Sequence, residues 1–179
     1  MTATRHSKRN EEQNLEDDIE INEIGIEDLH PVFLLGERSF TAGRWPNLYR
    51  TWDEYEVVNF FASDRETCFV AKQGERLLGF VLGTTIAKRR SAWSYGWIVW
   101  LAVDPGVKKR GVGRALFKEV QSKFIELGNR MLLVDTDARN HEAIDFFKRQ
   151  GFGHENKHVY MSLNLTHLPE YKRLRQADD

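Results

Sequence analysis

The chain has 179 residues, the length of about one globular domain, and 41% of them are hydrophobic, enough for a core. The formal net charge of −1 argues against a nucleic-acid-binding protein, and no apolar run reaches the roughly 18 residues of a membrane span. A single cysteine, Cys68, excludes an internal disulfide and is typical of a reducing compartment. We therefore expect a cytoplasmic protein that binds neither nucleic acid nor membrane.

Charge and hydrophobicity divide the chain into three segments. Residues 1–18 mix charges of both signs with few apolar side chains, so we expect them to be disordered. Residues 19–166 carry the periodic patterns of one folded domain. Residues 167–179 are polar and charged and form a C-terminal tail.

The first half of the domain predicts one strand, two helices and a hairpin. Residues 19–22 alternate like a strand, and residues 28–40 have helical spacing. Thr51 and Glu54 match a capping box that opens a second helix. Residues 67–73 and 76–86 form two strands joined by a short turn. Gly79 and Gly83 interrupt the second of these strands, which indicates bulges or a close backbone approach.

The second half predicts a long strand over residues 91–103, a helix that ends at Gly128, and a short buried strand over residues 131–134. Asn140 is an N-cap for a helix that Gly151 closes, and residues 159–165 alternate as a final strand. In the long strand, a period of two places six residues on one face: Trp93, Tyr95, Trp97, Val99, Leu101 and Val103. The expected fold is a single α/β domain with a mixed antiparallel and parallel sheet and helices on both faces.

The segment between the long strand and the next helix has the features of a phosphate-binding loop. The apolar strand ends at Val103, and residues 104–106, Asp-Pro-Gly, make a turn. A strand followed by a loop and a helix N-terminus presents backbone N–H groups and a positive dipole to an anion. Gly111 and Gly113 allow a ligand close to the backbone. Four basic side chains surround them: Lys108, Lys109, Arg110 and Arg114. The segment predicts a pyrophosphate site.

Two known phosphate loops fit this segment poorly. A Walker A loop would need a lysine and a hydroxyl residue where Val112 and Gly113 stand. A dinucleotide-binding turn would use Asp135 as its ribose acid, but Leu116 replaces the third glycine and the loop is too long. An ordinary turn with solvated lysines remains the simplest alternative.

Two motifs in register resemble the Gcn5-related N-acetyltransferases. The family's loop, Gln/Arg-x-x-Gly-x-Gly/Ala after Val-x-Pro, is matched by residues 108–113, with lysine in first place. The family's second motif, Asn-x-x-Ala-x-x-x-Tyr-x-x-x-Gly-Phe, is matched by residues 140–152, with Phe147 at the tyrosine. The resemblance covers roughly residues 19–165.

This resemblance implies acetyl-CoA as cosubstrate and a strand pair that splays to admit its pantetheine arm. The backbone N–H near Leu101 would stabilise the oxyanion. The residues that the resemblance assigns to the coenzyme are Leu101, Ala102, Val103, Lys108, Lys109, Arg110, Gly111, Val112, Gly113, Arg114, Asn140 and Phe147. No metal site is expected, because no cluster of ligating residues has metal-binding spacing.

The resemblance also implies an amine acceptor that must lose a proton before it attacks the thioester. Asp135 stands where related N-terminal acetyltransferases carry a glutamate, and it is equally well read as a structural carboxylate. Phe147 cannot protonate the leaving thiolate, so Tyr160 is the candidate donor, although a thiolate with a pKa of ~8.5 leaves readily by itself. Six residues are candidates for the acceptor site: Arg44, Trp45, Tyr49, Arg50, Trp52 and Tyr55.

The predicted activity is transfer of an acetyl group from acetyl-CoA to a primary amine, either of a small molecule or of a protein N-terminus. Two alternatives stay open from the sequence. The first is a coenzyme A-binding module without turnover, and the second is a dinucleotide-binding oxidoreductase. The oligomeric state is open as well, although homodimers are frequent in the family.

Overall fold

The computed structural model describes residues 19–41, 51–87, 93–107, 110–156, 158–159 and 161–176. Its main elements follow the order expected from the sequence as far as the last strand. They are β1 (Glu20–Glu23), α2 (Leu29–Ser39), α3 (Glu54–Ser63), β2 (Cys68–Gln73), β3 (Arg76–Ala87), β4 (Ser94–Val103), α4 (Val112–Glu126), β5 (Met131–Val134), α5 (His141–Arg149) and α6 (Pro169–Gln176). In the described ranges, no helix has both the length and the hydrophobicity needed to cross a bilayer.

The strands form one mixed sheet in the order β1-β2-β3-β4-β5. Neighbouring strands from β1 to β4 are antiparallel, and β5 pairs with β4 in parallel. The parallel pair is connected through α4, as a crossover connection requires. This arrangement confirms the mixed α/β sheet that the sequence predicts.

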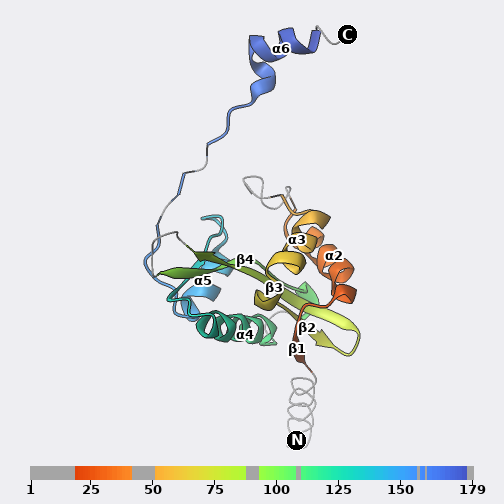
Figure 1. Ribbon diagram of the computed structural model, residues 1–179, viewed down its shortest axis with the longest axis vertical. Coiled ribbons are helices and arrows are strands. Elements are labelled where there is room, and N and C mark those ends of the chain that lie inside the picture. The colour runs from red at the N-terminus through yellow and green to blue at the C-terminus, as the bar shows by residue number, and fades with distance from the viewer. Residues whose placement is uncertain are drawn as a thin grey trace, which may run out of the picture.

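Helices cover both faces of the sheet (Figure 1). On one face, α4 and α5 contribute Leu116, Phe124 and Phe147 to a core that includes Val81 and Ile98 of the strands. On the other face, α2 and α3 contribute Val32, Leu35 and Val57 to a second core. The strand residues of that second core include Val70, Phe80, Leu82 and Trp100. The sheet is therefore buried on both sides where helices cover it.

Glycines in the central strands make room for the helix α4. A Cβ on Gly96 would lie 2.6 Å from Cδ1 of Phe124, and one on Gly83 would lie 2.8 Å from Cζ of the same ring. A Cβ on Gly79 would meet the carbonyl oxygen of Ala102 at 2.8 Å. The close approaches expected at Gly79 and Gly83 are confirmed.

A β-bulge changes the direction of the side chains along β4. The pairing of β3 with β4 shifts between Leu82 and Gly83, so Trp100 faces Leu82 while Ile98 faces Gly83. Val99 is the extra residue, and it packs with Trp100 in the core of α2 and α3. Leu101 and Val103 instead pack with the core of α4 and α5. The prediction that one face carries all six residues, Trp93, Tyr95, Trp97, Val99, Leu101 and Val103, is therefore wrong, because the extra residue breaks the period of two.

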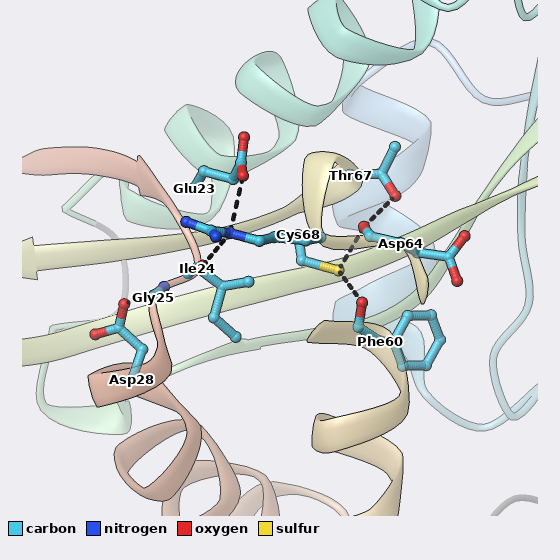
Figure 2. Close-up of polar contacts among 9 residues, drawn as sticks. Glu23, Ile24, Gly25, Asp28, Phe60, Asp64, Thr67 and Cys68 are labelled. Atoms are coloured by element: carbon cyan, nitrogen blue, oxygen red, sulfur yellow. Dashed lines mark hydrogen bonds and ion pairs between the residues drawn. The ribbon is translucent and has the colours of Figure 1, made fainter. Parts of the chain in front are cut away.

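Figure 2 shows how the end of α3 is joined to β1 and β2. Nε of Arg65 donates to the carbonyl oxygen of Ile24 at 3.1 Å and lies 3.0 Å from Oε1 of Glu23. The hydroxyl of Thr67 and the thiol of Cys68 both donate to the carbonyl oxygen of Asp64. Burial raises the pKa of Cys68 to about 12, so the thiol stays protonated and serves packing.

Two local predictions need correction. The helix α3 is capped by Asp53, whose side chain accepts from the backbone N–H of Glu56 at 2.9 Å, and not by Thr51. Trp52 lies in the core, so the chain is still extended there and the helix begins later. The final strand expected over residues 159–165 is absent, because alternation needs a neighbouring strand and these residues pair with none in the described ranges. A 3-10 turn, η4 (Leu165–His167), and α6 follow instead.

Candidate active site

The strands β4 and β5 separate in the middle of β4. Their parallel ladder begins at the pair Tyr95–Met131 and ends at the pair Ile98–Val134, while β4 continues to Val103. In the described ranges, no pair between β4 and β5 follows Ile98–Val134. The separation begins at the β-bulge, where the strand's twist is locally increased. It leaves Leu101, Ala102 and Val103 on the stretch of β4 that β5 does not accompany, as the sequence motifs imply.

The turn after β4 is held by Asp104. Its backbone N–H donates to the carbonyl oxygen of Leu78 at 2.8 Å, which ties the end of β4 to β3. Its Oδ1 accepts from the backbone N–H of Gly106 at 2.8 Å, and its Oδ2 lies 3.2 Å from Nη2 of Arg76. The hydrogen bond from Gly106, together with Arg76, lowers the pKa of Asp104. The carboxylate thereby fixes the direction in which the chain leaves the sheet toward α4.

The N-terminus of α4 presents the backbone N–H groups of its first turn. Gly111 is the N-cap residue, with φ of 84° in the left-handed region, and its carbonyl oxygen accepts from the N–H of Ala115. No side chain of the described residues caps the first turn. Val112 and Leu116 are buried beneath it and hold the helix on the sheet. The conformational bend lies at Gly111, whereas Gly113 belongs to the first helical turn.

A hollow lies at this helix terminus, with one basic residue, Arg110, in its lining beside Ile19, Gly111, Val112 and Ala115. Nη2 of Arg110 is buried and has no hydrogen-bond partner among the described residues. A buried guanidinium nitrogen without an acceptor is costly, and an anion at the helix terminus would satisfy it. This arrangement fits a phosphate group.

Asp135 directly follows β5 and is exposed. Its Oδ1 accepts a hydrogen bond of 3.0 Å from Nε1 of Trp97, which lies on the paired part of β4. The contact places the carboxylate next to the point where the two strands separate. A carboxylate held at this point could accept a proton from a group bound over the splayed strands.

Two residues of the second motif, Asn140 and Phe147, have structural roles. Oδ1 of Asn140 accepts from the backbone N–H of Ala143 at 3.2 Å, so the predicted N-cap is confirmed. Phe147 is 8% exposed and packs edge-on against Phe146 and Phe152. Its hydrophobic ring helps to attach α5 to the core. Coenzyme contacts of these two residues stay predictions.

The candidate acceptor residues divide between core and surface. Trp52 is buried, stacks on Phe80 and donates from Nε1 to the carbonyl oxygen of Phe33, so it belongs to the core. Tyr55 is 69% exposed on α3 and remains accessible to a substrate. Four other candidates lie outside the described residues, namely Arg44, Trp45, Tyr49 and Arg50, as do Lys108, Lys109 and Tyr160.

Sequence reasoning missed three contributors to this site. Trp97 contacts Asp135, Arg76 contacts Asp104, and Ile19 lines the hollow at α4. Each is distant in sequence from its partner, so no local pattern could have found it. Of the three, Trp97 is identified by the parallel register of β4 and β5, which sets it opposite Leu133.

The sequence also matches a known family. The sequence profile described as the Acetyltransferase (GNAT) family matches residues 38–152, which include the splayed strand, the glycine loop and the second motif. The chain belongs to the GNAT acetyltransferase family. The family assignment accounts for both the mixed sheet and the loop at α4.

Relatives of this GNAT chain differ in the acceptors that their names state. N-alpha-acetyltransferase 30 from Xenopus laevis is 24% identical over 118 residues, which cover 66% of this chain and 43% of the relative. The chain thus spans less than half the length of that protein. An aminoglycoside acetyltransferase from an uncultured soil metagenomic sample, solved with sisomicin, is 21% identical with a TM-score of 0.65, covering 84% of this chain and 99% of the other. The NatC complex bound to Gag peptide and CoA is 15% identical with a TM-score of 0.64, covering 86% and 92%. Both solved structures have the same fold as this chain.

Proposed function

We propose that this protein is an acetyl-CoA-dependent N-acetyltransferase that acts on a primary amine. The observation that carries the proposal is the end of the β4–β5 ladder at Ile98–Val134, which leaves the last stretch of β4, leading to the glycine loop of α4, without β5 beside it. The backbone of Leu101, Ala102 and Val103 would bind the pantetheine arm like an added strand. A backbone N–H near Leu101 would stabilise negative charge on the thioester oxygen.

The pyrophosphate of the cosubstrate would lie at the N-terminus of α4. The buried, unpartnered nitrogen of Arg110 and the uncapped first turn support this position within the described residues. Gly111, Val112, Gly113 and Arg114 would contribute backbone N–H groups and a further positive charge. Lys108 and Lys109 would add to that charge. Asn140 and Phe147 would bound the coenzyme from the side of α5.

Asp135 would act as the general base. The neutral amine forms a bond to the carbonyl carbon of the thioester, and its proton passes to the Asp135 carboxylate directly or through one water. Trp97 would hold that carboxylate in place through its hydrogen bond. The bond between carbon and sulfur then breaks, and the electron pair leaves with sulfur. The product amide and a thiolate result.

The leaving thiolate would take a proton from Tyr160 or from solvent. Phe147 has no proton to give and is buried in the core. Because a thiol has a pKa of ~8.5, a thiolate is a stable leaving group near neutral pH and needs little acid assistance. A Tyr160→Phe variant should therefore retain most of its activity, and a loss of ~100-fold would show that a donor is required.

The acceptor class is a primary amine, either on a small molecule or at a protein N-terminus. The names of the relatives support both kinds, because one is called an N-alpha-acetyltransferase and another an aminoglycoside acetyltransferase. The single, buried and protonated cysteine is compatible with a cytoplasmic protein. An amine panel should therefore contain N-terminal peptides, aminoglycosides and polyamines.

The experiment is a thiol-release assay with acetyl-CoA across that panel, combined with calorimetric titration of CoA and acetyl-CoA. We expect binding of both and thiol release with at least one amine. Binding without release on any amine would instead indicate a coenzyme A-binding module. Heat with NAD alone would indicate the oxidoreductase alternative. Absence of heat with CoA and acetyl-CoA would overturn the proposal.

A further inference from the structure

The splayed stretch of β4 has a second fixed carboxylate beside it, on the side of α3. Nε1 of Trp100 donates a hydrogen bond of 2.8 Å to Oε2 of Glu56. Trp100 lies beyond Ile98, where the pairing of β4 with β5 ends. Glu56 belongs to the first turn of α3 and is partly exposed. Its carboxylate is therefore held beside the part of β4 from which β5 has separated.

The indole that holds Glu56 has a fixed position. Trp100 is 3% exposed, and its ring contacts Phe40 and Trp52 at centroid distances of 4.7 Å and 5.1 Å. A buried indole N–H needs an acceptor, but the oxygen of a neutral amide would serve as well as a carboxylate. The hydrogen bond alone thus does not account for the negative charge at this position.

The charge of Glu56 is not balanced within the described part of the chain. None of the ion pairs between described residues includes Glu56. Its two neighbours in the first turn of α3 add no positive charge, since one is the acid Glu54 and the other is Tyr55. A partly exposed carboxylate that is fixed by a buried indole is suited to bind a cation from outside the protein.

Asp135, the proposed base, lies on the same face of the sheet as Glu56. Neighbouring residues of a strand point to opposite faces. Ile98 packs in the core of α4 and α5, so Trp97, which holds Asp135, points to the face of α2 and α3. Trp100 packs in the core of α2 and α3. The Cα atoms of the two tryptophans are at most about 10 Å apart along β4. Two indole-held carboxylates thus border the start of the splay from one side.

This face is the side from which an acceptor would approach. The proposed pyrophosphate position is the N-terminus of α4, and α3 and α4 cover opposite faces of the sheet (Figure 1). An amine that attacks a thioester held between the separated strands would come from the face that carries Asp135 and Glu56. The acceptor would therefore meet both carboxylates.

We propose that the acceptor is a small molecule with at least two amino groups and that Glu56 binds one of them. This inference rests on the proposed function. One amine gives its proton to Asp135 and attacks the thioester carbon, while another stays protonated and forms a charge-assisted hydrogen bond to Glu56. Glu56 is thus a specificity-determining residue and takes no part in the chemical step.

A polyamine fits two separate carboxylates better than a protein N-terminus does. A peptide carries one amino group at its end, and the peptide groups that follow are neutral hydrogen-bonding groups. Unless a basic side chain follows, nothing in the peptide matches the charge of Glu56. A small polyamine carries several ammonium groups on one short frame, so each carboxylate can receive its own.

The first measurement compares thiol release from acetyl-CoA with polyamines and with single amines. The polyamines are diaminoalkanes of increasing length, spermidine and an aminoglycoside, and the single amines are butylamine and hexylamine. We expect kcat/KM to be higher for the best polyamine than for either single amine. Glu56→Gln should lower the ratio of these values by about tenfold, because a hydrogen bond to a charged group is lost.

The variant Glu56→Gln removes the charge and keeps the fold. Its side-chain oxygen can still accept from Trp100, so the melting temperature should stay the same. Glu54→Gln is the matched control, because Glu54 is an exposed acid of the same helix that lies about 200° around the helix axis from Glu56. The control should leave the ratio of kcat/KM values unchanged.

The outcomes separate this inference from the proposed function. Polyamines that react no better than single amines, or a ratio that Glu56→Gln leaves unchanged, would overturn the inference and leave the acetyltransferase activity in place. A higher kcat/KM for N-terminal peptides than for any polyamine would overturn it as well.

A second measurement decides the case in which no amine releases thiol. Spermidine is titrated by calorimetry into the protein saturated with CoA. Binding that Glu56→Gln weakens about tenfold, and that Glu54→Gln leaves unchanged, would support the amine site even though the proposed function had failed. Absence of binding, or equal binding by both variants, would overturn the inference.

Discussion

Asp135 and Trp97 form the single side-chain contact on which the proposed acceptor chemistry depends most directly. The carboxylate is exposed, and its position is set by the indole N–H at 3.0 Å. A base must lie within reach of the proton that it removes, so the fixed indole matters as well as the acid. Trp97 is thus a positioning residue in the proposed reaction.

Asp135→Asn should lower kcat/KM for the best amine by about 10²–10⁴-fold, because the amide cannot take the proton. The affinity for CoA should stay unchanged, since the proposed coenzyme site does not include Asp135. Asp145→Asn is the control, an exposed acid on α5 to which the proposed reaction gives no role. Steady-state kinetics and calorimetry measure the two effects. An unchanged kcat/KM in Asp135→Asn would remove this residue from the reaction.

Asp135 could be found from sequence, and its partner could not. An acid directly after a buried strand is a local feature, visible in residues 131–135. Trp97 looked like one of several alternating aromatic residues, because only the register of β4 against β5 sets it near the acid. The role of a residue that acts through a neighbour depends on a distance that no local pattern contains.

At the scale of elements, the start of α4 depends on the left-handed conformation of Gly111. Gly111→Ala should destabilise the protein by about 1–2 kcal/mol, because an alanine is strained at a φ of 84°. The added Cβ meets no protein atom within 4 Å, and Gly111 itself lines the hollow at the start of α4. The affinity for CoA should therefore also fall, by about tenfold if one hydrogen bond of ~1.4 kcal/mol is lost.

Gly128→Ala is the matched control for that substitution. Gly128 also has a positive φ, of 75°, and an open Cβ position, but it follows the other end of α4. The two variants should lose similar stability in urea unfolding, while only Gly111→Ala should bind CoA more weakly in calorimetry. Equal affinities in both variants would contradict a pyrophosphate site at Gly111.

The turn that connects β4 to this helix should make stability depend on pH. The pKa of Asp104 is lowered from 3.8, so its charged contacts stabilise the fold above that pH and are lost as the pH falls through the lowered value. Asp104→Asn should cost about 1 kcal/mol at pH 7, since the bond from Gly106 then goes to a neutral acceptor. The difference from wild type should shrink in strong acid. Urea unfolding at neutral and acid pH checks this, and a constant difference would contradict it.

Some local sequence patterns predicted their elements correctly, and others did not. Gly74 has a positive φ in the predicted turn, and Asn140 caps the predicted helix through a hydrogen bond from Ala143. Both predictions depend on the residue's own segment, and both are correct. The capping box at Thr51 was wrong, because the burial of Trp52 keeps the chain extended until Asp53. Local chemistry decides an element only where tertiary packing does not oppose it.

At the scale of the whole molecule, α4 is fitted to the sheet by the ring of Phe124, which lies over Gly83 and Gly96. Gly96→Ala should destabilise the protein by about 1–3 kcal/mol, because its Cβ would lie 2.6 Å from that ring and 2.7 Å from Leu132. The melting temperature should fall by roughly 4–8 °C for a loss of ~2 kcal/mol. Gly153→Ala, whose Cβ would meet no atom within 4 Å, should leave it unchanged. Equal melting temperatures would show that the helix can shift.

The sequence by itself determined the order of the elements as far as α5, the mixed sheet and the position of the glycine loop. These follow from periodicity, turn residues and two motifs, each of which depends on neighbours along the chain. Only the tertiary structure decided where β5 leaves β4, which face Leu101 takes after the bulge, and that Trp97 contacts Asp135. It also decided that the alternating segment over residues 159–165 forms no strand in the described ranges. Such features depend on pairing between distant segments. An alternating pattern indicates that a strand needs a neighbouring strand, but it does not identify that neighbour.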